Sequence, residues 1–175
     1  MNFKSILLIF IAVLMWSFGL PKNTQKKVDK EIKEVFGIEN FDFTSVSLAE
    51  NITKDLPSNF GADNLFKIKA SNALIGYAYV SQAPSKTAQF DYFVLLDKDL
   101  IVVKTKVFAY REEYGGEIGS TRWLKQFIGK KPSDDLRYGD NIVAISGATI
   151  SVRSMTNAMN NLLQSLKTLH SKKIL

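Results

Sequence analysis

Three hydroxyl side chains stand within six residues of one another before the last helical stretch of the chain. They are Ser146, Thr149 and Ser151, in the run Ile145-Ser-Gly-Ala-Thr-Ile-Ser151. An apolar, strand-like run over 141–145 precedes this motif, and a helical pattern follows it. A helix N-terminus offers unpaired N–H groups and partial positive charge. Because hydroxyl groups can also bond or esterify a phosphate, the motif suits a phosphate group.

The two small residues between these hydroxyls support the same interpretation. Gly147 and Ala148 leave room for a bulky group to approach the backbone. A simpler interpretation stays open on spacing alone, because Thr149 or Ser151 could be an ordinary N-cap of the helix that follows.

The rest of the chain contributes few reactive groups. Its 175 residues include no cysteine and a single histidine, His170. This composition excludes disulfides, thiolate nucleophiles, cysteine-bound metals, a lipoprotein cysteine anchor and a histidine metal cluster. A Ser-His-Asp triad is unsupported, and redox chemistry is expected to come from a bound cofactor.

Two segments resemble the FMN-binding domain family. That family includes the covalently flavinylated domains of the sodium-translocating NADH:quinone reductase and of the related electron-transport complex. The first segment is the motif described above, which resembles the family's flavinylation motif. The second is Tyr110-Arg-Glu-Glu-Tyr-Gly-Gly-Glu-Ile-Gly119, followed by a helical stretch that ends in Gln126-Phe-Ile-Gly129. The resemblance covers roughly residues 65–169.

The resemblance implies a covalent cofactor. In the family, the last Thr of the motif carries FMN through a phosphoester bond, which a flavin transferase installs from FAD. Thr149 takes that position here. The other motif residues would surround the phosphate, with Ser146, Gly147 and Ala148 as the loop and Ile150 and Ser151 close by.

The second segment would then contact the flavin ring. Gly115 and Gly116 would permit close approach of the isoalloxazine, Glu113 could accept a hydrogen bond from a ring N–H, and Tyr114 or Trp123 could stack on it. Alternatively, Trp123 is a core residue and Glu113 a solvated charge.

Two features depart from the family's pattern, and one is that the glycine loop lacks the Thr-Pro of the respiratory subunits. Val143 stands three residues before the motif serine, where members often carry an acid. We expect slower attachment, or a non-covalent flavin, if the transferase needs that acid.

The hydrophobic pattern predicts an α+β fold in which helices cover one antiparallel sheet, and the resemblance implies the twisted sheet of the FMN-binding domain type. Residues 21–175 are expected to form a single domain. Strands are predicted at 41–48, 65–69, 74–81, 90–97 and 100–110, and helices at 25–36, 120–128 and 151–169. Ser71-Asn72 and Asp97-Lys98-Asp99 are predicted as tight turns between strands.

Residues 1–20 are predicted to be a signal peptide or a membrane anchor. Lys4 precedes an uncharged apolar run over 6–20, which contains small residues suited to a cleavage site. An uncleaved anchor involving residues 3–20 and a buried core helix are the alternatives. The first two place the domain outside the cytoplasm, in the periplasm or at the outer face of the membrane.

These expectations favour an electron-transfer flavoprotein over a stand-alone enzyme. Its partners would be a flavin transferase for maturation and membrane or periplasmic redox proteins. Nucleic acid is not expected, because the net charge of +6 is modest and spread along the chain. A non-covalent flavin-binding module and a flavin-free secreted structural module remain as alternatives.

Overall fold

The computed structural model describes residues 20–61 and 63–175. The predicted signal peptide or anchor, apart from Leu20, lies outside these described residues. Within them, no helix has both the length and the apolarity needed to cross a membrane.

In the described part of the chain, five antiparallel strands form one sheet in which chain order and spatial order coincide. The predicted α+β class is therefore confirmed. The strands are β1 (Asp42–Ser45), β2 (Leu65–Ala70), β3 (Ala73–Pro84), β4 (Gln89–Asp97) and β5 (Val102–Ala109).

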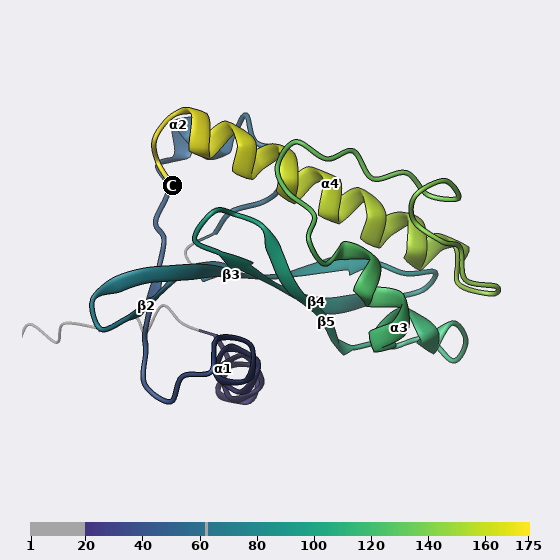
Figure 1. The fold of residues 1–175 in the computed structure, drawn as a ribbon. Helices are drawn as coiled ribbons and strands as arrows, with labels where there is room; N and C mark the ends of the chain where they lie inside the picture. Colours follow the sequence, from purple (N-terminus) through teal and green to yellow (C-terminus); the bar gives the residue numbers. More distant parts are fainter. Residues whose placement is uncertain (1–19, 62) are drawn as a thin grey trace, which may run out of the picture.

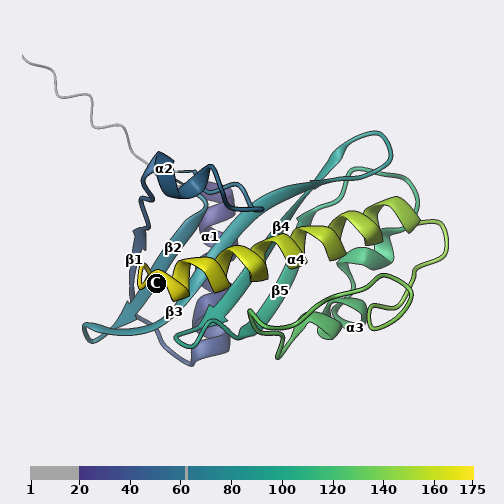
Figure 2. The ribbon, with the colours of Figure 1, turned by 90° about the horizontal axis from the view of Figure 1, so that it is seen from above.

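The two long helices cover opposite faces of this sheet, as Figures 1 and 2 show. Helix α1 (Lys22–Phe36) packs on one face and α4 (Thr149–Ser171) on the other. Strand β4 supplies both interfaces by alternation: Val94 and Leu96 belong to the α4 cluster, and Phe93 and Leu95 to the α1 cluster. This period of two produces a three-layer arrangement from a single sheet.

The two predicted turns are confirmed. Ser71 and Asn72 join β2 to β3 with φ of 49° and 65°. Asp97 closes the β4–β5 connection, because its Oδ1 accepts hydrogen bonds from the N–H groups of Asp99 and Ile101, both at 2.9 Å. Leu100 in the same connection has a φ of 63°.

Two sequence-based assignments were wrong in detail. The helix predicted over 120–128 is divided into α3 (Thr121–Leu124) and the 3-10 helix η2 (Lys125–Phe127), after a first 3-10 helix, η1 (Gly116–Gly119). The short helix α2 (Glu50–Thr53) was not predicted.

The strand-like run over 141–145 forms no strand and contributes a single bridge, between Tyr138 and Ile142. The backbone of Val143 bonds side chains instead of a strand.

Candidate functional site

A cavity of about 740 Å³ lies where three segments of the fold meet. Its volume falls within the range of small-molecule sites, about 300–1,000 Å³. The tip of the β3–β4 hairpin, the segment after β5 and the start of α4 supply its walls. The lining residues are Lys86 and Thr87, then Tyr110, Arg111, Glu112, Glu113 and Tyr114, and finally Gly147, Ala148, Thr149, Ile150 and Ser151.

Thr149 is the first residue of α4, and its side chain is exposed. Ala148 is the N-cap, and no side chain caps the helix. The simpler interpretation, that Thr149 or Ser151 is the N-cap, is therefore wrong. The preceding Gly147 has a φ of 77°, a conformation that favours glycine. The hydroxyl of Thr149 is thus placed at a helix N-terminus without being used to cap it.

Ser151 has a different position from Thr149, although both lie in the first turn of α4. Its side chain is buried, and its Oγ lies 3.0 Å from the hydroxyl of Tyr110. The Tyr110 ring lies 6.0 Å from the ring of Phe90 on β4. This contact joins the start of α4 to the residue that follows β5, and so fixes one corner of the cavity.

Four of the predicted site residues are not among those that line the cavity: Ser146, Gly115, Gly116 and Trp123. Ser146 is exposed. Gly115 contacts the motif, because a Cβ at this position would lie 2.5 Å from the Cβ of Ala148. The structure therefore explains the glycine at 115 by its contact with Ala148.

Trp123 also does not line the cavity. Its side chain is 6% exposed, and its ring packs edge-on against Phe127 with centroids 5.3 Å apart. The indole Nε1–H donates to the carbonyl of Val143 at 2.8 Å. The structure gives no support to stacking of Trp123 on a flavin and places it in the core, beneath the segment that leads to the motif.

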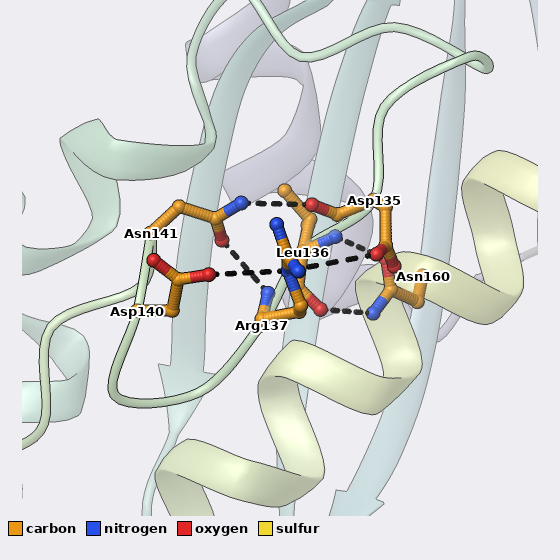
Figure 3. A network of polar contacts seen from close by, with 6 residues as sticks. All are labelled: Asp135, Leu136, Arg137, Asp140, Asn141 and Asn160. Carbon is orange, nitrogen blue, oxygen red and sulfur yellow. Dashed lines mark hydrogen bonds and ion pairs between the residues drawn. The ribbon is translucent and has the colours of Figure 1, made fainter.

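That leading segment is anchored at two places by side chains. Gln126 Oε1 accepts a hydrogen bond from the N–H of Val143 at 2.7 Å, beside the Trp123 contact. Further back, Asn160 of α4 bonds both the N–H and the carbonyl of Leu136, at 2.8 and 2.5 Å. Figure 3 shows this second anchor, with Asn141 bonded to the backbone of the same loop. Side chains thus position the approach to Thr149 where a strand was expected.

The carboxylate most firmly bound at the site is that of Glu112, which sequence reasoning missed in favour of Glu113. Its Oε1 accepts from the N–H groups of Thr87 and Ala88 at 2.7 and 3.2 Å, and its Oε2 accepts from Thr87 Oγ1 at 2.9 Å. The side chain of Ser85 and these groups lower the pKa of Glu112 to about 2. Glu112 therefore joins the hairpin tip to the segment after β5, while Glu113 is exposed on the cavity wall.

Exposed apolar side chains surround the motif. Tyr114 is 76% exposed and Ile150 is 50% exposed, and both line the cavity. Val143 is 63% exposed. The predicted residues Tyr114 and Ile150 are therefore accessible to a ligand in the cavity.

Lys86, Thr87, Tyr110 and Arg111 complete the lining and were not predicted. Lys86 and Thr87 reach the site only because β3 and β4 form a hairpin whose tip lies beside the start of α4. No local pattern in the sequence marks that proximity. Tyr110 and Arg111 stood in the second segment of the resemblance, next to the residues that were chosen.

Comparisons of the chain with known families and structures bear on which ligand the cavity could hold. The sequence model of the FMN-binding domain matches residues 87–164, which contain Thr149 and most of the cavity lining. Over these residues the chain is similar to the FMN-binding domain family. The crystal structure of Shewanella oneidensis NqrC matches with a TM-score of 0.59 and 13% sequence identity, covering 87% of this chain and 98% of that one. At this identity the match shows a shared fold. No curated protein matches the sequence.

The residues present fit FMN. The N–H groups of the first turn of α4 have no partners within that helix. The hydrogen bonds of the helix begin at Val152, whose N–H donates to the carbonyl of Ala148 at 2.9 Å. The start of α4 can therefore bind the phosphate of FMN. The remaining walls include an exposed aromatic ring, that of Tyr114, which suits a planar ring system.

Proposed function

We propose that this protein is an extracytoplasmic flavoprotein that carries electrons on FMN linked to Thr149 by a phosphoester bond. When bound, FMN accepts and donates one or two electrons. The protein holds the cofactor and sets its surroundings, and this role agrees with a chain that has no cysteine and one histidine.

The observation that supports the linkage best is the position of Thr149. It is exposed on the cavity wall at the first residue of α4, with a hydroxyl that caps nothing. Ser151 in the same turn is buried against Tyr110, so its hydroxyl is less accessible to another protein. A covalent bond would also prevent loss of the cofactor from a protein outside the cytoplasm.

The proposed maturation step is a transfer of FMN from FAD by a flavin transferase. Thr149 Oγ1 attacks the phosphorus of the FMN half and loses its proton. The bond from that phosphorus to the bridging oxygen breaks, and AMP leaves. The Thr149 side chain needs access to the transferase for this step, and its exposure at the helix start supports such access.

Intact-mass measurement tests the linkage directly. The full chain is co-expressed with a flavin transferase, and we expect a mass increase equal to FMN less water. Thr149→Ala should abolish the increase, and Thr149→Ser should retain it because the hydroxyl remains.

Thr121→Ala is the matched control, because Thr121 is an exposed threonine at the first residue of another helix, α3, and does not line the cavity. It should still gain the mass. A wild-type chain that gains no mass but releases flavin on acid precipitation would contradict the covalent linkage and show non-covalent binding. Protein without visible absorbance after treatment with transferase, FAD and magnesium would contradict flavin binding altogether.

A further inference from the structure

Four charged side chains line the cavity, and two of them are bound by other groups of the protein. The four are Lys86, Arg111, Glu112 and Glu113. Arg111 pairs with Asp91, its Nη2 lying 2.6 Å from Oδ2, and its Nη1 donates to the carbonyl of Gln89 at 2.7 Å. Glu112 is bound by the N–H groups of Thr87 and Ala88. Arg111 is therefore paired with an opposite charge, while Glu112 keeps its charge but is held by hydrogen bonds to the hairpin tip.

The other two charges are available. Within residues 20–61 and 63–175, neither Lys86 nor Glu113 makes a hydrogen bond or an ion pair, and both side chains are exposed. Lys86 is therefore the cation on the cavity wall that remains unpaired in the described part of the chain. It lies on the hairpin tip, a different wall from that of Thr149.

The hairpin tip that carries Lys86 is held in place by hydrogen bonds. Glu112 binds the N–H and the hydroxyl of the next residue, Thr87, at 2.7 and 2.9 Å. Its neighbour Arg111 binds the carbonyl of Gln89 at the start of β4. Two consecutive residues after β5 thus bind the β4 side of the tip, and the N–H of Ser85 donates to the carbonyl of Ala88 at 2.8 Å, so the backbone on either side of Lys86 is bonded although its side chain is free.

This placement has a consequence for the flavin, and it rests on the proposed function. With the phosphate at Thr149, the ring system would face the walls that carry Lys86, Glu113 and Tyr114, all of which line the cavity. Reduction of the ring by two electrons and one proton leaves one negative charge on it. A cation nearby stabilises that charge, and an anion opposes it.

We propose that Lys86 is the residue that stabilises the reduced flavin electrostatically, and that Glu112 is the positioning residue that holds Lys86 at the ring. Lys86 thereby raises the flavin's midpoint potential, and Glu113 lowers it.

Redox titration of the flavin-loaded full chain tests this proposal. The bound flavin is titrated with dithionite against a reference dye. In Lys86→Gln, the ratio of reduced to oxidised flavin at a fixed potential should fall about three- to tenfold. A tenfold change corresponds to about 30 mV for a two-electron couple. Lys86→Arg should keep the wild-type ratio.

Two further variants separate the local charge from other effects. Lys167→Gln removes an equal charge from an exposed position on α4 that lines a different cavity, and it should leave the ratio unchanged. Glu113→Gln should raise the ratio, because it removes the opposing charge from the same wall.

The positioning role of Glu112 has its own variants. Thr87→Val removes the hydroxyl bond to Glu112 without changing any charge, and it should lower the ratio in the same direction as Lys86→Gln but by less, since the lysine is kept while its support is weakened. Glu112→Gln removes a negative charge of the cavity wall together with that support, so its ratio should rise less than that of Glu113→Gln. A wild-type ratio in Thr87→Val, or a rise in Glu112→Gln as large as that in Glu113→Gln, would overturn the positioning role.

The same potential in Lys86→Gln as in wild type would overturn the proposal. Failure of the proposed function would be seen earlier and separately, as a wild-type chain that takes up no flavin before any titration begins.

Discussion

At the scale of single residues, two adjacent glycines show how the motif loop is packed. Gly115 has a φ of 80°, and a Cβ there would lie 2.5 Å from the Cβ and 3.1 Å from the Cα of Ala148. Gly116 has no atom within 4 Å of the same virtual position and no such φ. The first glycine is needed for contact with the loop before Thr149, and the second is not.

Gly115→Ala is therefore expected to lower the free energy of unfolding by about 1–3 kcal/mol, from overpacking and backbone strain together. Urea unfolding followed by circular dichroism measures this change. Gly116→Ala is the matched control and should stay within about 0.5 kcal/mol of wild type. Equal stability of the two variants would show that Ala148 moves aside without cost.

The residue scale also shows where sequence reasoning succeeds and where it fails at the site. Gly147, Ala148, Thr149, Ile150 and Ser151 are contiguous, so one motif brings them all to the cavity. The choice between the neighbours at 112 and 113 depended on which carboxylate meets the hairpin tip. That is a property of tertiary structure, and the chosen Glu113 is the exposed one.

At the scale of elements, Glu112 links two segments that are far apart in the sequence. Its pKa of about 2 in the folded state lies below the usual value of 4.5, because the side chain of Ser85 and the groups of Thr87 and Ala88 hold the ionised form. A carboxylate with a lowered folded-state pKa stabilises the fold above its unfolded pKa. That contribution is lost as the pH falls through the folded pKa.

Glu112→Gln should therefore be less stable than wild type at pH 7, and the difference should shrink between about pH 4.5 and 2. Urea midpoints at a series of pH values measure this. Burial raises the pKa of Asp91, but hydrogen bonds from Arg111 and Gln82 outweigh it and lower that pKa overall. Because the variant and the wild type both contain Asp91, its contribution cancels in the difference between their stabilities. Glu113→Gln should follow the wild-type curve, because its carboxylate makes no bond within the described residues. A difference that does not depend on pH would contradict the ionic link.

Most elements could be predicted from local sequence. The strands are short runs rich in β-branched and aromatic residues between turn signals, and α4 repeats its apolar residues at helical spacing. The run over 141–145 is apolar but has no neighbouring strand to pair with. Its backbone is bonded by Trp123 and Gln126, which only the folded chain brings near. Short helices such as α2 bury no continuous stripe and leave little pattern to read.

At the scale of the whole molecule, the sheet lies between the helix that contributes to the cavity and the helix that does not. The cavity is built from α4, the β3–β4 tip and the segment after β5, and α4 lies on one face of the sheet. Helix α1 covers the other face through a separate apolar cluster. Its buried Glu31, 2% exposed, is paired with Lys104 and Lys106 of β5. Changes in α1 should therefore affect stability without reaching the flavin site.

Glu31→Gln tests this separation. Burial raises the pKa of Glu31, but the hydrogen bonds and charges of Lys106 and Lys104 outweigh it and lower the pKa overall. The carboxylate is thus ionised and paired at pH 7. Its replacement should lower the free energy of unfolding by about 1–3 kcal/mol, since the two lysines are partly exposed and regain water. Urea unfolding measures the loss, while intact mass and redox titration of the remaining folded protein should match wild type. A shifted flavin potential in this variant would show that the two faces of the sheet are coupled.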